Sequence, residues 1–444
     1  MKRNRFIRVV SMLIAVGVTV VHLAACGKDK TNDSPPVTFR IISWNEDFRN
    51  LMENYFIPRH SELMRNVRLE WVTDEINGYR SGVQRRLADG EQIDLFLGDS
   101  EMAPYFAADN NVATLAQVGI NDSELSAQYR FARILGSDRD GVQKGSAFDI
   151  EPGILLYRTD YAEQYLGITH QEEMQEKLSS WDSFVSVARA LSENSGGKVR
   201  MLPNSAELWK SVECAMYGLW LSEGQLSVSD ETIGHWLDIV KELESLNAFA
   251  GVKTLDDDWY SSIDSGVFCF YAAPWLCKSS PAGQADITTV FSSARRSGAS
   301  FGKFKTSLAP NGFVYGGRWL YCPKKSANMD IAAEIIRAFT CDSGFMKLIA
   351  LAEMQYVNNS DVCSELAGMK IPNPLFDGLD AFSVYNAAAR GLEFSSPTVY
   401  DASISRLLYD QTKKYGNGEI RLSEAINHFR LNVWKKHEEI TSEP

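Results

Sequence analysis

The sequence predicts an α/β fold built around a parallel sheet. Residues 37–99 alternate short apolar runs with amphipathic stretches, in the order strand, helix, strand, helix, strand. This order makes the strands parallel, because each helix carries the chain back through a right-handed crossover. Of the 444 residues, 45% are hydrophobic and 23% are charged, as in globular proteins. A mainly disordered chain and a membrane protein with several spans are excluded, and the length suggests two or three domains.

Hydrophobic periodicity defines the first elements. Strands are expected over residues 37–43, 67–72 and 93–97, with helices over 46–56 and 78–88. Ligands of such sheets bind at the carboxyl ends of the strands. The residues at those ends are Trp44, Asn45 and Glu46 after the first strand, and Asp99 and Glu101 after the third.

The same alternation continues along the chain. Further strands are expected over residues 153–157, 267–272 and 313–322. Amphipathic stripes predict helices over 181–192, after Ser229, over 330–340, and over 403–436 with a break at 415–418. Ser229 and either Ser326 or Asn328 are the expected N-caps.

The N-terminus has the parts of an export signal. Basic residues precede an apolar run over 9–21 that is short for a permanent span, and the run ends in LAAC with Cys26 last. This resembles a bacterial lipoprotein signal, in which the cysteine is lipidated; the alternative is an ordinary signal with an incidental cysteine. Removing residues 1–25, which hold four cations and no anions, changes the net charge from −12 to −16. We therefore expect no nucleic-acid partner and a body held by lipid through a tether over 26–36.

The cysteines and histidines predict no metal site, and no cofactor is expected. Six cysteines follow Cys26, an even number that permits three disulfides in an exported protein. Cys269 and Cys322 lie in apolar runs, where buried thiols are common. There is no CxxC pair, and the histidines are scattered. The pairing of the cysteines stays open.

Four stretches are similar, in order and spacing, to segments of a known family. They are VTFRIISWNEDFRNLMENYF, IDLFLGDSEMAPYFAADNNVATL, GILLYRTDYAEQYLG and FVYGGRWLYCPKKSANMDIAAEIIRAFT. These resemble the extracellular solute-binding proteins of bacterial ABC importers, in the carbohydrate-binding family that includes maltose-binding protein. The resemblance covers roughly residues 37–437, although Arg158 stands where the family usually has Asn.

The resemblance implies a two-lobed periplasmic-binding-protein-like fold with a hinge between the lobes. Lobe one would be residues 37–150 plus 312–370, and lobe two residues 151–311 plus 371–444. It also implies a lipid-anchored protein on the extracytoplasmic face of the cell membrane. That protein would capture a carbohydrate, in particular an oligosaccharide, and present it to a membrane-embedded ABC permease. We expect a monomer without catalytic residues.

Sugars are bound by aromatic platforms and by carboxylate, amide or guanidinium groups. The resemblance places Trp275 and Tyr400 at stacking positions and Glu151 at an acidic ligand contact. Arg318 and Trp319 follow paired glycines in the last strand. The predicted ligand-binding residues are therefore Trp44, Asn45, Glu46, Asp99, Glu101, Glu151, Trp275, Arg318, Trp319 and Tyr400.

Each candidate also has a structural alternative. Trp44 and Trp319 could belong to the core, and Asp99 could cap the next helix. Glu151 could be a solvated charge near the hinge, and Arg318 could form a structural ion pair. Three other tryptophans lie on helical stripes and are expected in the core: Trp181, Trp236 and Trp434.

Enzyme motifs are weak. Residues 298–302 (GASFG) match GxSxG, but a nucleophile elbow needs a strand before it and a helix after it, and a polar loop is expected there. The sequence has no GxxxxGK[ST], HExxH or GxGxxG motif. The alternatives to a sugar binder are a binder of another solute (a polyamine, a phosphorylated compound or a peptide), a surface glycoside hydrolase and a sensor domain.

Overall fold

Two separate sheets organise the fold. The computed structural model describes residues 35–278, 300–376 and 380–440. The chain divides into a short unit, Met1–Val37, and a large one, Thr38–Pro444, which holds both sheets apart from the first residue of β1. The predicted export signal, Cys26 and most of the tether lie outside the described residues.

The larger sheet is mixed, in the strand order β2-β1-β3-β10-β4. β1 and β3 are parallel, as predicted, with Ile41 opposite Leu95, whereas β10 runs antiparallel to both β3 and β4. The sequence did not reveal β4, because this buried strand carries two carboxylates, Asp149 and Glu151. The bounds are β1 Val37–Ser43, β2 Val67–Thr73, β3 Leu95–Asp99, β4 Ser146–Pro152 and β10 Val314–Tyr321.

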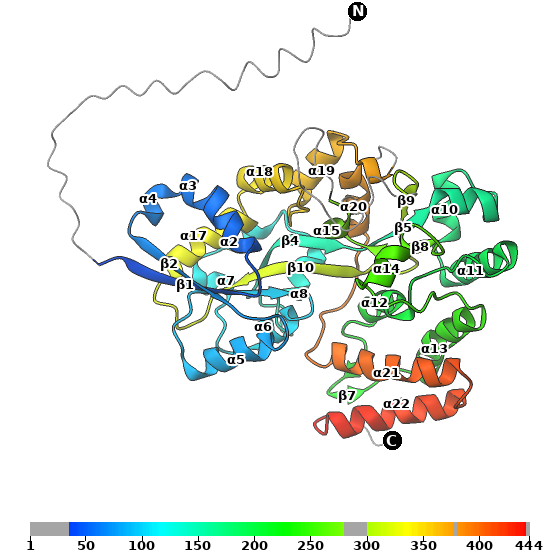
Figure 1. The fold of residues 1–444 in the computed structure, drawn as a ribbon. Helices are drawn as coiled ribbons and strands as arrows, with labels where there is room; N and C mark the ends of the chain where they lie inside the picture. The colour runs from blue at the N-terminus through cyan, green and yellow to red at the C-terminus, as the bar shows by residue number, and fades with distance from the viewer. Residues whose placement is uncertain (1–34, 279–299, 377–379, 441–444) are drawn as a thin grey trace, which may run out of the picture. The chain divides into compact units, whose positions relative to one another are not determined.

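Helices cover both faces of this sheet (Figure 1). Successive residues of a strand point to opposite faces, so Ile42 packs in the apolar cluster that includes α5 and α6. Ile41 belongs instead to the cluster that includes α2, η1 and α17. The bounds are α2 Asp47–Leu51, η1 Met52–Phe56, α5 Tyr79–Asp89, α6 Ala103–Ala108 and α17 Met329–Thr340.

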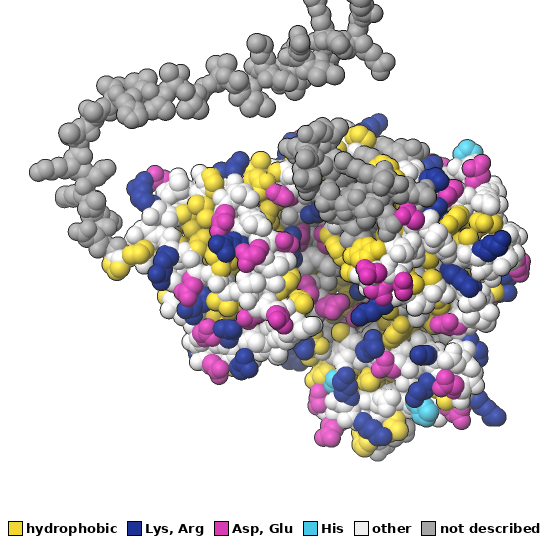
Figure 2. All heavy atoms as spheres, in the orientation of Figure 1, with side chains coloured by type: hydrophobic (Ala, Val, Ile, Leu, Met, Phe, Trp, Pro, Cys, Tyr) yellow, Lys and Arg dark blue, Asp and Glu magenta, His cyan; other side chains and the backbone are white. Residues whose placement is uncertain are grey.

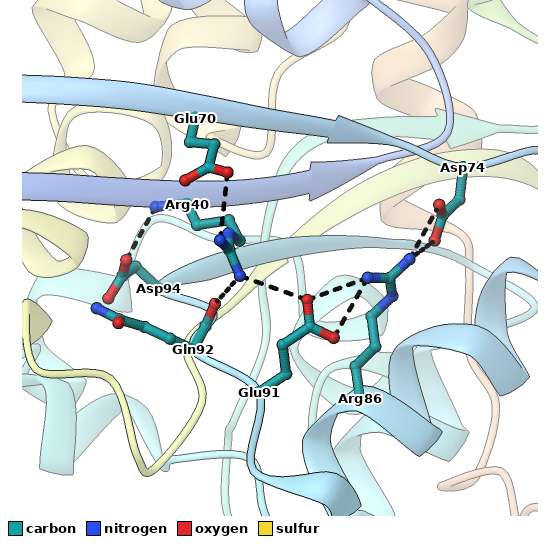
Figure 3. Close-up of polar contacts among 7 residues, drawn as sticks. All are labelled: Arg40, Glu70, Asp74, Arg86, Glu91, Gln92 and Asp94. Atoms are coloured by element: carbon teal, nitrogen blue, oxygen red, sulfur yellow. Dashed lines mark hydrogen bonds and ion pairs between the residues drawn. The ribbon is translucent and has the colours of Figure 1, made fainter.

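An ion-pair network ties the edge of this sheet to α5 (Figure 3). Arg40 of β1 contacts Glu70 of β2 at 3.2 Å and Glu91 at 3.4 Å. Arg86 of α5 contacts the same Glu91 at 3.1 Å and Asp74 at 3.3 Å. Single exposed pairs contribute little, but a network fixes several segments at once.

The smaller sheet has the order β8-β5-β9, and both pairings are antiparallel. Its strands are β5 Ile154–Arg158, β8 Cys269–Ala272 and β9 Phe304–Ser307. The helices around it include α10 Gln171–Lys177, α11 Trp181–Ser195, α12 Ser205–Ala215, α13 Asp230–Ser245, α14 Asp257–Ser262 and α15 Pro274–Cys277. The C-terminal helices α21 Asp401–Gly416 and α22 Leu422–Lys436 pack on α13, with the predicted break between them.

Shorter elements complete the chain. In the first part they are α3 Ile57–Arg59, α4 Ser61–Met64, α7 Leu115–Val118, η2 Asp122–Leu125, α8 Arg130–Leu135, α9 Thr159–Tyr161, η3 Ala162–Leu166, β6 Leu221–Ser222 and β7 Gln225–Leu226. In the last part they are α18 Ser343–Glu353, α19 Ser360–Gly368, η4 Pro374–Phe376 and α20 Ala381–Arg390.

The chain crosses between the sheets at a tightly packed point. β4 leads directly into β5 through Gly153, and β9 returns to β10 past Phe313. The Gly153 amide donates to the Phe313 carbonyl at 2.7 Å. A Cβ on Gly153 would lie 2.2 Å from the Phe313 ring. The two crossing segments therefore touch, and only glycine leaves room for that contact.

Ser229 and Asn328 both occupy the predicted N-cap positions, but only Ser229 makes a side-chain cap bond. The Ser229 hydroxyl accepts the Thr232 amide at 3.1 Å at the start of α13. Asn328 precedes α17, but its side chain makes no cap bond. The reason is Asp94, a buried carboxylate that accepts hydrogen bonds from both Asn328 and Ser326.

The core contains most of the apolar side chains singled out in the sequence. Trp181 and Trp236 are buried, but Trp434 is 45% exposed, so its assignment to the core is wrong. All six cysteines of the described part are free, and Cys269 and Cys322 are buried as expected. Across residues 35–278, 300–376 and 380–440, every helix is too short or too polar to cross a membrane.

Candidate functional site

A cavity of about 560 Å³ opens between the two sheets. Its walls come from the turn after β3, from Tyr315 in β10, and from α12, α15 and α21. A smaller cavity of about 160 Å³ shares Glu101, Lys210, Glu213 and Tyr315 with it and extends to Asp99. In Figure 2, acidic side chains gather where the surface is hollowed at the middle of the molecule.

Helix α12 supplies one wall through a charged stripe. Glu207, Lys210 and Glu213 are three residues apart, which places them on one face of the helix. The opposite face is buried through Leu208 and Val212. The helix starts at a side-chain cap, because Asn204 accepts the Glu207 amide at 3.0 Å. Packing and capping together point the stripe into the cavity.

Trp275, at the start of α15, is the best anchored aromatic side chain of the cavity. Its backbone N–H donates to the Glu151 carboxylate at 2.9 Å, and its indole N–H donates to the Tyr315 carbonyl at 3.1 Å. The next residues of β10, Gly316 and Gly317, have φ of +123° and +109°, values that L side chains rarely adopt. A Cβ at Gly316 would lie at ordinary contact distance, 3.4 Å from the Glu151 side chain, so the backbone conformation rather than the space favours glycine here.

Helix α21 forms a second wall beside α12, with a face that repeats at helical spacing: Ala402, Ser405, Arg406 and Tyr409. The Trp209 indole N–H donates to the Ser405 hydroxyl at 2.9 Å. The rings of Trp209 and Tyr409 have centroids 5.2 Å apart. These contacts join α12 to α21 and fix the shape of the cavity.

The carboxylates of the smaller cavity repel one another. Burial and the nearby Glu101 raise the pKa of Asp99 to about 6, although its carboxylate accepts the amides of Glu101 and Met102. Burial and Glu101 likewise raise the pKa of Glu213 to about 7. Lys210 is the nearby cation, 3.9 Å from Glu101 and 4.6 Å above the Tyr315 ring.

Glu207 is the most deeply buried carboxylate of the larger cavity. Burial raises its pKa to about 7. Three donors oppose this rise: the Trp259 indole N–H, the Thr254 hydroxyl at 3.1 Å and the Tyr271 amide at 3.3 Å. Its hydrogen bonds are thus directed at the protein, and it acts as the support of this wall.

Glu151 and Arg318, both predicted to contact the ligand, are held by hydrogen bonds within the protein. Glu151 is only 4% exposed and lies behind Trp275. Burial and the neighbouring Asp149 raise the pKa of Glu151 well above its usual range. Arg318 contacts Asp149 at 2.9 Å and Asp47 at 3.2 Å. Arg318 therefore forms the structural ion pair that was the alternative to ligand binding. Glu151 is not solvated, and it does not line the surface of the cavity.

Of the remaining predicted residues, Asp99, Glu101 and Trp275 line the cavities. Trp319 does not: it is fully buried and its indole N–H donates to the Ala132 carbonyl at 2.9 Å. Its structural alternative, a place in the core, describes its contacts, because it packs in the same apolar cluster as α5 and α6. Tyr400 lies at the start of α21 with its ring 5.3 Å from His437, outside both linings.

The three residues after β1 also lie outside both linings. Trp44 packs edge-on against Tyr79 with centroids 5.2 Å apart. Asn45 donates to the Asp47 carboxylate at 3.1 Å. Glu46 is exposed, with Arg49 at 3.3 Å. These side chains organise the start of α2.

Sequence reasoning missed the residues that helices contribute. The signal for α12 was a polar stripe at positions 207, 210 and 213 on an otherwise buried helix. For α21 it was Tyr409, which lies on the same face as Ser405 and Ala402. Both signals appear only when residues are compared at helical spacing, whereas the prediction considered residues at the ends of strands.

The GxSxG match lacks the context of a nucleophile elbow. Residues 298 and 299 lie outside the described part of the chain. The residues after Ser300 lead into strand β9 rather than a helix, and the Ser300 hydroxyl donates to Asp264 at 2.6 Å. No group of three potential metal ligands occurs among the described residues.

Comparison with known proteins identifies the family. Residues 62–368 match the sequence model of the bacterial extracellular solute-binding proteins. The chain belongs to this family. Extracellular solute-binding proteins act outside the cytoplasm and bind small molecules. No curated protein sequence matches the chain.

Solved structures show the same fold. An extracellular solute-binding protein of family 1 superposes with a TM-score of 0.75 at 16% identity, over 90% of this chain and 99% of its own. The sugar-binding protein MalE from Xanthomonas citri gives 0.68 at 12%, over 92% and 100%. The galacto-N-biose/lacto-N-biose I-binding protein of an ABC transporter from Bifidobacterium longum gives 0.66 at 14%, over 92% and 99%. The two-lobed periplasmic-binding-protein-like fold is thereby confirmed.

Proposed function

We propose that this solute-binding protein captures a carbohydrate, an oligosaccharide, in the cavity between its lobes and delivers it to a membrane-embedded ABC permease. The lobes in this proposal are residues 37–150 plus 312–370 and residues 151–311 plus 371–444. Cys26 carries the lipid that holds the protein at the extracytoplasmic face of the cell membrane.

The observation that carries the proposal is the combination of aromatic and charged side chains that line the cavity. Trp275, Tyr315 and Tyr409 present aromatic surface, and Glu101, Glu213 and Arg406 stand beside them. Aromatic faces suit the C–H faces of sugar rings, and charged groups bond to hydroxyls. The volume of about 560 Å³ lies within the range of small-molecule sites. Sugar binding by the structural neighbours supports the same assignment.

The crossing at Gly153 supports a hinge between the lobes. β4–β5 and β9–β10 carry the chain between the sheets beside each other. Such paired crossings let two bodies rotate while the strands within each stay intact. Closure would bring the β3 turn toward α12 and α21 across the cavity.

The test is thermal unfolding of residues 27–444 against mono- and oligosaccharides, polyamines and amino acids. A ligand that binds only the folded state stabilises it by about 2.7 kcal/mol at a hundredfold excess over Kd. We expect a shift with one glycan class, with the glycan recovered intact. A shift with non-sugars alone, or a shortened glycan, would overturn the carbohydrate-binding proposal.

The matched variants are Trp275→Ala and Trp434→Ala. Both remove a partly exposed indole, but Trp434 lies on α22, outside the cavity lining. Loss of the stacking surface should weaken glycan binding at least about tenfold in Trp275→Ala. Trp434→Ala should bind as the unmodified protein does. Equal affinities for the two variants would exclude Trp275 from the site.

A further inference from the structure

The smaller cavity carries more negative than positive charge. Among the described residues that line it, Asp99, Glu101 and Glu213 are acidic and Lys210 is the one cation. All four lie close enough to influence one another, since Glu101 raises the pKa of both other carboxyls and Lys210 lowers both. With all four groups ionised, this part of the site has a net charge of about −2.

The protein itself leaves part of that charge without a partner. Asp99 accepts two backbone amides. Among the described residues, the Glu101 carboxylate has one charged partner, Lys210, at the long distance of 3.9 Å. In the described part of the chain, the Glu213 carboxylate has no hydrogen bond or ion pair, and it lies at the junction of the two cavities. Glu101 and Glu213 are therefore acceptors that face the space a solute would fill.

The neighbouring aromatic surface is suited to a cation as well as to a sugar. The Lys210 ammonium already lies 4.6 Å above the Tyr315 ring, a cation–π arrangement. Trp275 lies beside Tyr315, with ring centroids 6.1 Å apart. A neutral solute would remove water from the carboxylates without neutralising them, which is unfavourable. An ammonium group placed there would be attracted by carboxylates and aromatic faces together.

We propose that the solute is a carbohydrate bearing a protonated amino group, with its ammonium between Glu101 and Glu213. This inference rests on the proposed function and narrows it to a charged class of sugar. The sugar ring would lie in the larger cavity, against Trp275 and Tyr409. Lys210 would remain on Tyr315 and bond to a hydroxyl of the solute.

The experiment measures affinity for pairs of probes by calorimetry. Each pair is an amino sugar or its oligomer and the N-acetylated counterpart, which keeps the ring and linkage but loses the charge. The neutral parent sugar and free polyamines complete the set. We expect at least one free amine to bind about ten to a hundredfold tighter than its acetylated partner, the range for a hydrogen bond to a charged group.

The matched variants are Glu213→Gln and Glu193→Gln, the latter an exposed carboxylate on α11. Glu213→Gln should lower affinity for the amine about tenfold or more and lower affinity for its acetylated counterpart much less, whereas Glu193→Gln should change neither. Thermal melting of the free variants confirms that each is folded.

The outcomes separate the two proposals. Neutral or acetylated glycans that bind as tightly as amines, with Glu213→Gln unaffected, would overturn the inference and leave the carbohydrate function standing. Binding of polyamines without any amino sugar would overturn both. Absence of binding by every amine in the set would overturn the inference.

Discussion

The buried carboxyl groups that line the cavities also affect the stability of the folded protein. The pKa of Asp99 is raised to about 6 and that of Glu207 and Glu213 to about 7, in each case mainly by burial. The folded protein therefore binds protons that the unfolded chain has released at neutral pH. The stabilisation from these protonated groups is complete below about pH 4 and is lost as the pH rises through 6 to 7.

Removing one of these groups should change the pH profile of stability. We expect the free energy of unfolding of the unliganded protein to fall between pH 5 and pH 8. The fall should be smaller in Glu213→Gln, because glutamine cannot ionise, by on the order of 1 kcal/mol per unit of pKa shift removed. Urea unfolding at both pH values measures this. An unchanged slope in Glu213→Gln, with Glu193→Gln as the control, would contradict the burial of charge at Glu213.

For single residues, the sequence predicted the types of side chain at the cavity, aromatic and acidic, better than it predicted which residues supply them. Asp99 and Glu101 follow a strand, so strand topology was enough to find them, whereas Trp275 was placed at the site by the family resemblance. Trp319 was assigned to the site because it follows the paired glycines of β10, but both faces of the sheet are covered there and its side chain is fully buried. Glu213 was missed because it lies on a helix, and its role depends on Glu101 from a different part of the chain.

At the scale of elements, the crossing between the sheets is the most constrained contact. Gly153 and Phe313 leave no volume between the segments that join β4 to β5 and β9 to β10. Strands with simple alternation, such as β1 and β2, were predicted almost to the residue. β4 was not, because buried Asp149 and Glu151 interrupt its apolar pattern and are compensated by Arg318 and the Trp275 amide.

Two glycine variants should have opposite effects on stability. Gly153→Ala forces a methyl group against the Phe313 ring, and we expect destabilisation of about 1–3 kcal/mol. Gly82→Ala adds a methyl group inside α5 with its nearest neighbour 3.8 Å away, and we expect stabilisation of up to about 1 kcal/mol through helix propensity. Chemical denaturation measures both. Neutral behaviour of Gly153→Ala would mean that the crossing relaxes freely.

At the scale of the whole molecule, the net charge bears on how the protein could be attached to a membrane. The chain without residues 1–25 has a net charge of −16, which repels an anionic lipid surface. A body of this charge needs an attachment that overcomes this repulsion, and the lipid proposed on Cys26 would supply it. The sequence alone showed a basic segment, an apolar segment and LAAC in the order of an export signal. These residues lie outside the part of the chain that the structure describes.

A single substitution tests that attachment. Cys26→Ser should abolish incorporation of a labelled fatty acid into the full chain and release the protein from the membrane fraction, because stable anchoring requires the acyl chains. Cys341→Ser, at a partly exposed thiol of the folded body, is the control and should be labelled and retained normally. Continued labelling of Cys26→Ser would refute lipidation at this residue.

The reactivity of the six free cysteines among the described residues reports whether the body of the protein is folded or unfolded. Five thiols are buried, and burial raises the pKa of Cys214, Cys322 and Cys363 to about 12, so they are protonated and unreactive toward alkylating reagents. Cys341 is the partly exposed one. Burial also raises the pKa of the Cys341 thiol, so a brief pulse of such a reagent tags a native molecule of residues 27–444 at one position at most and a fully unfolded one at six. The mass of each molecule records which it was.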